Sequence, residues 1–279
     1  METSTGIEDE YGHEGNVEYI LENVLMPDDG SPEFKHLQDE YNCQLTLCCK
    51  CTSNYSCKDS AVCCHGGGLE YNPEYGELVL ITSAAREFPT IVECNDLCEC
   101  DQSQCRNRLV QFGPRKKLEI YNSPLYKSKG LRTSVAIPRG AFICEYAGEL
   151  LTLPEAQRRL ELIDKTRLMN YILYLCEYAK PKSHKSKTNL LEITIVDPSR
   201  RGNIGRYLNH SCEPNCEILA VRTNCPIPKI AIFAKRNINV NEELCFHYAG
   251  ENFDERKSSG KLCLCGASNC CGFMPNTKI

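Results

Sequence analysis

Short apolar runs separated by glycine, proline and asparagine dominate the chain between about residues 117 and 248. Runs of this length that are rich in β-branched and aromatic residues are typical of β-strands. The clearest predicted strands cover residues 141–146, 191–196, 229–234 and 243–248. The pattern of apolar positions therefore predicts a mainly β fold.

One helix interrupts the predicted strands. The sequence Thr152–Glu155 has the S/T-x-x-E form of a capping box, and Pro154 stands in the first turn, where its missing N–H costs little. Ala156, Leu160 and Ile163 then recur at helical spacing. We expect an amphipathic helix that begins at Thr152 and continues past Ile163.

Polar and turn-forming residues fill the segments outside this region. Residues 1–42 are acidic, and we expect an extended lead-in with a short helix over residues 17–24. The basic run at residues 180–187 is either a solvated turn or a contact for a substrate or phosphate. Composition divides the chain into residues 1–42, a cysteine-rich module at 43–115, a β-rich domain at 116–250 and a second cysteine module at 251–279.

Cysteine is the residue type whose abundance changes this picture. The 279 residues include 21 cysteines, and we expect no secretory signal, because the N-terminus is acidic and lacks an apolar stretch. Clustered thiolates in a reducing compartment are better interpreted as metal ligands than as disulfides. No run approaches the ~18 apolar residues of a membrane span. The net charge of −5 argues against a long DNA-binding track, so we expect neither a membrane nor specific DNA as a partner.

Nine of the eleven cysteines before residue 106 form two groups, in which C-x-C and adjacent C-C pairs recur. Independent tetrahedral zinc sites usually use C-x2-C or longer pairs, so these short pairs favour a cluster in which neighbouring residues face different ions. Nine thiolates fill the roughly twelve ligand positions of three zinc ions if three of them bridge. The alternative is a set of buried or disulfide-bonded cysteines. We expect a loop at residues 66–93, with Cys43 and Cys48 outside the cluster. The predicted ligands are Cys49, Cys51, Cys57, Cys63, Cys64, Cys94, Cys98, Cys100 and Cys105.

The sequence G-N-I-G-R-Y-L-N-H-S-C-E-P-N at residues 202–215 resembles the core motif of the SET-domain lysine methyltransferases. E-Y-A-G-E at 145–149, E-E-L-C-F-H-Y at 242–248 and C-L-C-G-A-S-N-C at 263–270 resemble other signatures of this family, in the same order. The nine-cysteine array resembles the pre-SET module of the Su(var)3-9 branch, and residues 202–206 are also similar to the SET portion of the transposase-fused Metnase. The resemblance implies a SET fold, with small curled β-sheets and a pseudoknot-like C-terminal threading.

The resemblance also implies roles for individual residues, with S-adenosyl-L-methionine as the cofactor. Tyr248 matches the catalytic tyrosine of the family, and Phe246 and Tyr146 would line the lysine channel with it, unless they only pack the core. Tyr207 has the same two interpretations. The implied cofactor-binding residues are Ser128, Lys129, Gly130, Tyr171, Arg206, Asn209 and His210. The implied ligands of a fourth, post-SET zinc ion are Cys212, Cys263, Cys265 and Cys270, with Cys271 left over.

The implied chemistry explains the tyrosines. A lysine amine has a pKa of about 10.4 and must lose its proton before it attacks a methyl group. An apolar channel and a nearby sulfonium both disfavour the ammonium form. Tyrosine hydroxyls can then orient the amine, which is mainly a positioning effect. Phe246 leaves space for methyl groups already added, so we expect di- or trimethylation.

The implied substrate is the histone H3 tail or the nucleosome, on chromatin in the nucleus. The pre-SET module favours lysine 9 as the target, and the similarity of residues 202–206 to Metnase favours lysine 36 as the alternative. Three departures from the family keep a SET fold that binds without turnover as a second hypothesis: Lys129 replaces a tryptophan, His247 replaces an aspartate, and Cys100 and Cys105 are one residue further apart than usual. A purely structural zinc protein would leave the motif residues Asn209, His210 and Tyr248 unexplained.

Overall fold

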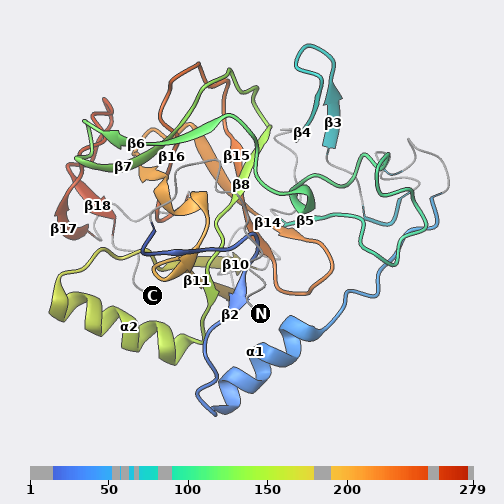
Figure 1. Ribbon diagram of the computed structural model, residues 1–279, viewed down its shortest axis with the longest axis horizontal. Coiled ribbons are helices and arrows are strands. Elements are labelled where there is room, and N and C mark those ends of the chain that lie inside the picture. Colours follow the sequence, from blue (N-terminus) through green and yellow to red (C-terminus); the bar gives the residue numbers. More distant parts are fainter. Residues whose placement is uncertain are drawn as a thin grey trace, which may run out of the picture.

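The computed structural model describes residues 15–51, 57, 63–65, 69–80, 90–178, 190–250 and 258–275, so the basic run at 180–187 lies outside the described residues. Many short strands form several small sheets, with two helices on one side (Figure 1). The prediction of a mainly β fold is therefore confirmed. Among the described residues, no helix is both long and apolar enough to cross a bilayer.

The central sheet of the fold joins a strand from the cysteine-rich module to three strands of the β-rich domain. Its strand order is β5-β14-β15-β8, with bounds Thr90–Val92, Cys216–Arg222, Lys229–Ala234 and Phe142–Glu145. Along β15, Ile230 and Ile232 face one hydrophobic cluster, whereas Ala231 and Phe233 face another. Because side chains alternate across a strand, this continuous apolar run packs a core on both faces of the sheet.

A second sheet carries the helices. Its strand order is β10-β11-β9-β2, with bounds Leu173–Tyr178, Leu190–Asp197, Glu149–Leu150 and Val24–Leu25. Helix α2 spans Leu153–Thr166 and is capped by Thr152, whose hydroxyl accepts a hydrogen bond from the Glu155 amide. Ala156 and Leu160 are buried against this sheet. The predicted helix is confirmed, and it ends at Arg167 in the left-handed region.

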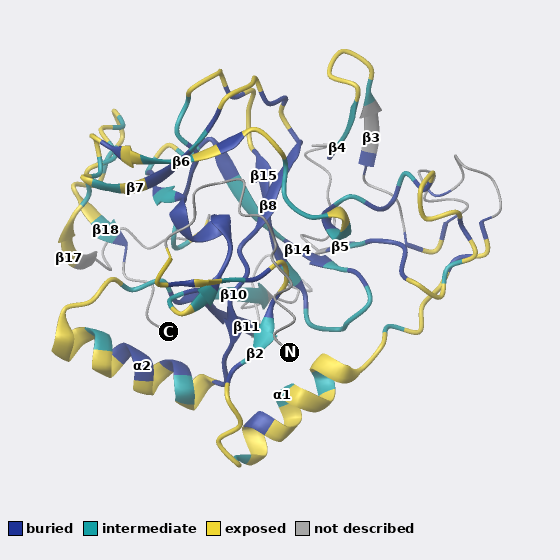
Figure 2. Cartoon of the chain, viewed as in Figure 1, coloured by how far each residue is buried: buried dark blue, intermediate teal, exposed yellow. Residues whose placement is uncertain are grey.

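The prediction of an extended lead-in with a helix over residues 17–24 is wrong. Strand β1, Glu18–Tyr19, pairs in parallel with β12, Arg201–Gly202, and β2 pairs in parallel with β9. The helix lies further along, where α1 spans Pro32–Asn42 with Ser31 as its N-cap. Phe34 is the buried residue of α1. Because most of the helix is exposed (Figure 2), it has little of the apolar periodicity by which a helix is predicted from sequence.

The connection between the two cysteine groups is more than the expected loop. Residues 66–93 contain a hairpin of β3, Leu69–Asn72, and β4, Glu77–Leu80, followed by β5. A short 3-10 helix at Val110–Phe112 follows the second cysteine group. The strand β5 pairs in parallel with β14, so this module supplies an edge of the central sheet.

The remaining elements surround one end of the central sheet. They are the hairpin of β6, Leu118–Ser123, and β7, Ser128–Thr133; the 3-10 helix η3, Ile204–Tyr207; the parallel pair of β13, Asn209–His210, and β16, Cys245–Phe246; and the terminal hairpin of β17, Ser258–Leu262, and β18, Phe273–Pro275. The strand expected over residues 243–248 is thus reduced to two residues. Its pairing with β13 brings the two family motifs side by side, as the implied threading requires.

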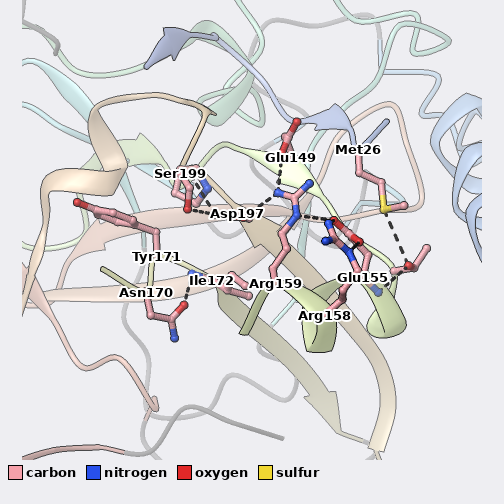
Figure 3. Close-up of polar contacts among 12 residues, drawn as sticks. Met26, Glu149, Glu155, Arg158, Arg159, Asn170, Tyr171, Ile172, Asp197 and Ser199 are labelled. Carbon is pink, nitrogen blue, oxygen red and sulfur yellow. Dashed lines mark hydrogen bonds and ion pairs between the residues drawn. The ribbon is translucent and has the colours of Figure 1, made fainter. Parts of the chain in front are cut away.

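A buried arginine locks α2 to the second sheet. Arg159 donates to Glu149 at 2.6 Å, to Asp197 at 2.7 Å and to Glu155 at 2.7 Å (Figure 3). Glu149 comes from β9 and Asp197 from β11, and both carboxylates are buried. One guanidinium therefore holds three elements together.

We expect Arg159→Met to lower the free energy of unfolding by about 3–5 kcal/mol, because it leaves two buried carboxylates without a cation. Arg158 is the matched control, since it binds the same Glu155 from a side chain that is 64% exposed. Arg158→Met should cost at most about 1 kcal/mol. Urea denaturation of both variants checks this, and equal losses would contradict it.

Candidate active site and metal centres

A cavity of about 680 Å³ lies where β7, η3, β13, β16 and the terminal hairpin meet. Its walls come from sequence positions between Tyr126 and Pro275. Of the residues that the sequence assigned to cofactor and catalysis, the lining includes Ser128, Lys129, Tyr146, Tyr171, Arg206, Asn209, His210, Phe246 and Tyr248. Tyr207 also lines it. The structure thus brings almost the whole set together.

Gly130 is the exception, because it does not line the cavity. It is buried in β7, and a Cβ at this position would collide with the carboxylate of Glu243. That carboxylate accepts hydrogen bonds from Tyr121 at 2.6 Å, from Ser123 at 2.8 Å and from the Asn209 amide at 2.8 Å. Gly130 therefore makes room for the group that orients Asn209.

Glu243 is a residue to which sequence reasoning gave no role, although it stands in the quoted E-E-L motif. The amide of Asn209 also donates to the Lys129 carbonyl at 3.1 Å. Asn209 is thus held from two sides, by Glu243 and by the backbone of β7. In the sequence, Glu243 is visible only as part of an acidic pair, Glu242 and Glu243, before an apolar strand. Such a pair usually lies at a solvent-exposed strand end, so it does not predict a buried hydrogen-bond acceptor.

The aromatic wall consists of Tyr146, Phe246 and Tyr248. The ring centroids of Phe246 and Tyr248 are 4.9 Å apart, and those of Tyr146 and Phe246 are 6.1 Å apart. The Tyr248 hydroxyl donates to the Leu208 carbonyl at 3.0 Å, and the Tyr146 hydroxyl donates to the Tyr171 carbonyl at 2.6 Å. Burial raises the pKa of both hydroxyls well above the ordinary tyrosine value, so both stay protonated at neutral pH.

Arg206 fixes the part of the cavity that Tyr171 and Tyr207 form. Its Nε donates to the Pro198 carbonyl at 3.1 Å, and its guanidinium carbon lies 4.3 Å from the centre of the Tyr171 ring and 5.0 Å from that of Tyr207. Cation–π contacts of this kind strengthen when they are desolvated, and Arg206 is buried. The arginine, which also lines the cavity, therefore holds the Tyr171 ring in place.

His210 links the cavity to the second cysteine module. Burial, helped by the neighbouring His247, lowers the pKa of His210 to about 4, so the ring is neutral at physiological pH. Its Nδ1 accepts a hydrogen bond from the Tyr248 amide at 3.2 Å. The proton is then on Nε2, which lies 3.6 Å from the sulfur of Cys212 and can donate to it.

The sulfurs of Cys212, Cys263, Cys265 and Cys270 all lie within 4.8 Å of one another, and Cys212 and Cys263 are 4.0 Å apart. Two thiolates bound to one tetrahedral zinc ion at about 2.3 Å would lie about 3.8 Å apart. The four predicted ligands therefore fit a closed, structural zinc site. Lys261, Leu262 and Met274 of the same hairpin line the cavity, so this site fastens one of its walls.

The first cysteine cluster also fits its expected metal. Cys49 lies 3.8 Å from Cys57 and 3.8 Å from Cys94, and it belongs to three overlapping groups of four metal-binding side chains. Shared members are what bridging thiolates require. These groups contain Cys49, Cys51, Cys57, Cys63, Cys94 and Cys100, together with His65, which the sequence did not single out. Cys98 and Cys105 pack in the same cluster, and Cys64 touches it through His65. None of the 21 cysteines forms a disulfide.

Two family models match the chain: the SET domain over residues 128–249 and the pre-SET motif over residues 4–108. The probable histone-lysine N-methyltransferase set-23 of Caenorhabditis elegans is 45% identical over 188 residues, which are 66% of this chain and 72% of that protein. The chain belongs to the SET-domain family of histone-lysine methyltransferases.

Further members of the family agree in sequence and fold. The histone-lysine N-methyltransferase SETMAR of Bos taurus is 42% identical over 205 residues, 70% of this chain and 64% of that protein, so the chain spans less than two thirds of that relative. The crystal structure of the human SETMAR methyltransferase domain matches with a TM-score of 0.71 and 33% identity, covering 94% of this chain and 90% of that domain. The structure of KRYPTONITE with DNA, an H3(1-15) peptide and SAH matches with a TM-score of 0.64 and 25% identity, covering 93% and 48%. The SET fold and both resemblances are confirmed.

Proposed function

We propose that this chain transfers methyl groups from S-adenosyl-L-methionine to a lysine of the histone H3 tail. One observation carries the proposal: a single cavity is lined by Asn209, His210 and Tyr248, which two motifs far apart in the sequence contribute. The KRYPTONITE structure, with SAH and an H3 peptide, supports the same cofactor and substrate class here.

The residues divide the cavity between two tasks. Asn209 and His210, with Ser128, Lys129, Tyr171 and Arg206, would hold the cofactor, which supplies an electrophilic methyl group when bound. The wall of Tyr146, Phe246 and Tyr248 would receive the lysine. Three zinc ions in the first cluster and one at Cys212 would be structural. All four coordination positions of each ion would be filled by protein ligands, which leaves no position for water or substrate.

The tyrosine wall explains how an amine is made reactive. Transfer into an apolar, aromatic channel disfavours the ammonium ion and releases the neutral amine. The Tyr248 hydroxyl donates its hydrogen bond to the Leu208 carbonyl, so the lone pairs of its oxygen can accept a hydrogen bond from the amine. This bond would align the nitrogen for attack, which is a positioning effect.

Lysine 9 is the proposed target, since the pre-SET module is typical of relatives that methylate it; lysine 36 is the alternative. The site of action would be chromatin in the nucleus. Labelled methyl transfer onto nucleosomes and onto an H3 peptide array tests the target, and calorimetry tests cofactor binding. Cofactor binding without transfer to any histone would overturn the proposal in favour of a SET fold that only binds.

Phe246 is expected to set the number of methyl groups added. The ring is buried, packs against Tyr248 and lines the cavity. It therefore presents an apolar surface, which suits a methylated amine because that amine has fewer N–H groups in need of hydrogen-bond acceptors. A tyrosine hydroxyl there can hold a water in the space that a further methyl group needs. We expect di- or trimethylation by the native chain and mostly monomethylation by Phe246→Tyr, measured by mass spectrometry of the peptide over time. A monomethylated peptide is the control: the native chain should extend it, and the variant should not.

Lys129 is expected to weaken cofactor binding relative to tryptophan-bearing relatives. Its side chain is exposed at the cavity, where a lysine stem covers less of a bound ligand than an indole ring. Lys129→Trp should tighten S-adenosyl-L-methionine by about 0.5–1.5 kcal/mol in calorimetry. Lys116→Trp, on an exposed residue away from the cavity, is the control. Unchanged affinity in Lys129→Trp would mean that this side chain is not a cofactor wall.

A further inference from the structure

His65 is a buried histidine inside the first cysteine cluster. Its Nδ1 lies 3.6 Å from the sulfur of Cys63, 3.6 Å from that of Cys64 and 3.8 Å from that of Cys94. A nitrogen and a sulfur bound to one tetrahedral zinc ion, at about 2.0 and 2.3 Å, would lie about 3.5 Å apart. Of these sulfurs, those of Cys63 and Cys94 form with Cys49 and His65 a group whose ligand atoms all lie within 4.8 Å of one another, so Nδ1 occupies the place of a fourth ligand beside three sulfurs.

The second ring nitrogen of His65 identifies the tautomer. Its Nε2 lies 3.2 Å from the Leu47 carbonyl and 3.9 Å from the sulfur of Cys98. A carbonyl can only accept, so the ring proton is on Nε2 and the lone pair is on Nδ1. A lone pair that faces several thiolates is repelled unless a cation lies between them.

His210 provides an internal comparison. Its Nε2 also lies 3.6 Å from a cysteine sulfur, but its Nδ1 accepts a hydrogen bond from the Tyr248 amide. The nitrogen of His210 that faces sulfur is therefore an N–H donor, whereas the one of His65 is bare. Both histidines carry the ring proton on Nε2, but His210 turns that N–H toward sulfur, whereas His65 turns its unprotonated Nδ1 toward sulfur.

We propose that Nδ1 of His65 is a zinc ligand of the first cluster, in addition to the nine cysteines. Among the described residues, His65 belongs to the set of Cys49, Cys63, His65 and Cys94, whose ligand atoms all lie within 4.8 Å of one another. The Leu47 carbonyl then holds the second ring nitrogen, which is the usual support of a metal-bound histidine. With an imidazole among the ligands, about two bridging thiolates are enough for three zinc ions.

Nuclear magnetic resonance of the full chain tests this directly. The protein would carry ¹⁵N-labelled histidine, with its zinc replaced by ¹¹³Cd. We expect scalar coupling between Nδ1 of His65 and one cadmium ion, with the proton on Nε2, and no cadmium coupling for either nitrogen of His210. A proton on Nδ1 of His65, or the absence of coupling, would overturn the proposal and make His65 a hydrogen-bond donor.

Zinc content gives a second readout that does not depend on methyl transfer. His65→Ala should lose one cluster zinc to a chelator at a concentration at least 100-fold lower than the native chain requires. His65→Cys should restore retention, since it offers another ligand. His36→Ala is the control, because His36 lies on the exposed face of α1. Native zinc affinity in His65→Ala would contradict the proposal, and should that variant fail to fold, the coupling in the native chain still decides.

Discussion

Tyr248→Phe is expected to reduce the rate of methyl transfer by about 100-fold or more, while the protein stays folded. The change removes only the hydroxyl that donates to the Leu208 carbonyl at 3.0 Å and that would accept from the lysine amine. Loss of alignment of a reacting atom costs rate on this scale. The phenyl ring still packs on Phe246 and His210, so the free energy of unfolding should fall by only about 0.5–1.5 kcal/mol.

Tyr41→Phe is the matched control for this experiment. The Tyr41 hydroxyl also donates to a backbone carbonyl, that of Asn23 at 3.0 Å, but it lies outside the cavity. This variant should lose similar stability and keep its methyl transfer rate. Initial rates with labelled cofactor and thermal unfolding measure both quantities. Native activity in Tyr248→Phe would show that the active-site strand has been misassigned.

Removal of zinc is expected to have the largest effect on the fold. Structural zinc ions contribute about 10–16 kcal/mol each to folding of small domains, more than the stability of a typical domain. We therefore expect about four zinc ions per chain by elemental analysis, and loss of structure in the first cysteine module when a strong chelator is added. One zinc or none, with disulfides in place of thiols, would contradict this prediction.

Cys270 and Cys271 separate the effect of the metal from that of losing a thiol. Cys270 lies within the group of four sulfurs around Cys212, whereas its neighbour Cys271 is exposed and outside it. Cys270→Ser should lose one zinc and most activity, because the terminal hairpin that lines the cavity is no longer fastened. Cys271→Ser should keep all its zinc and its activity. Equal zinc content in the two variants would rule out the four-cysteine site.

Local signals predicted the elements whose sequence pattern is set by neighbouring residues. The run at residues 229–234 became β15 with the same bounds, and the capping box at Thr152 became the N-terminus of α2. Both signals depend on neighbouring residues alone: apolar continuity in the strand, and the hydroxyl-to-amide bond in the cap. The short strands β1 and β2 have no such signal, because pairing with β12 and β9 makes them strands.

The site residues likewise divide into those that sequence motifs predict and those whose role depends on contacts distant in the sequence. Motif positions such as Asn209 and Tyr248 were placed at the cavity by resemblance, and the structure brings them there. Glu243 and His65 were missed because their importance comes from distant contacts: Glu243 with Tyr121 and Asn209, and His65 with Leu47 and three cysteines. Neither residue type predicts such contacts, since an exposed carboxylate or a loop histidine is the common case.

The pairing of the first strands has a practical consequence for anyone who shortens this protein. Because β1 and β2 pair with β12 and β9, residues 18–25 are part of two sheets of the β-rich domain and not a separate N-terminal extension. A version trimmed to begin after residue 42 would leave both partner strands with bare backbone donors and acceptors, which invite neighbouring molecules to pair with them. Such a version would tend to aggregate even though every motif residue and zinc ligand were present.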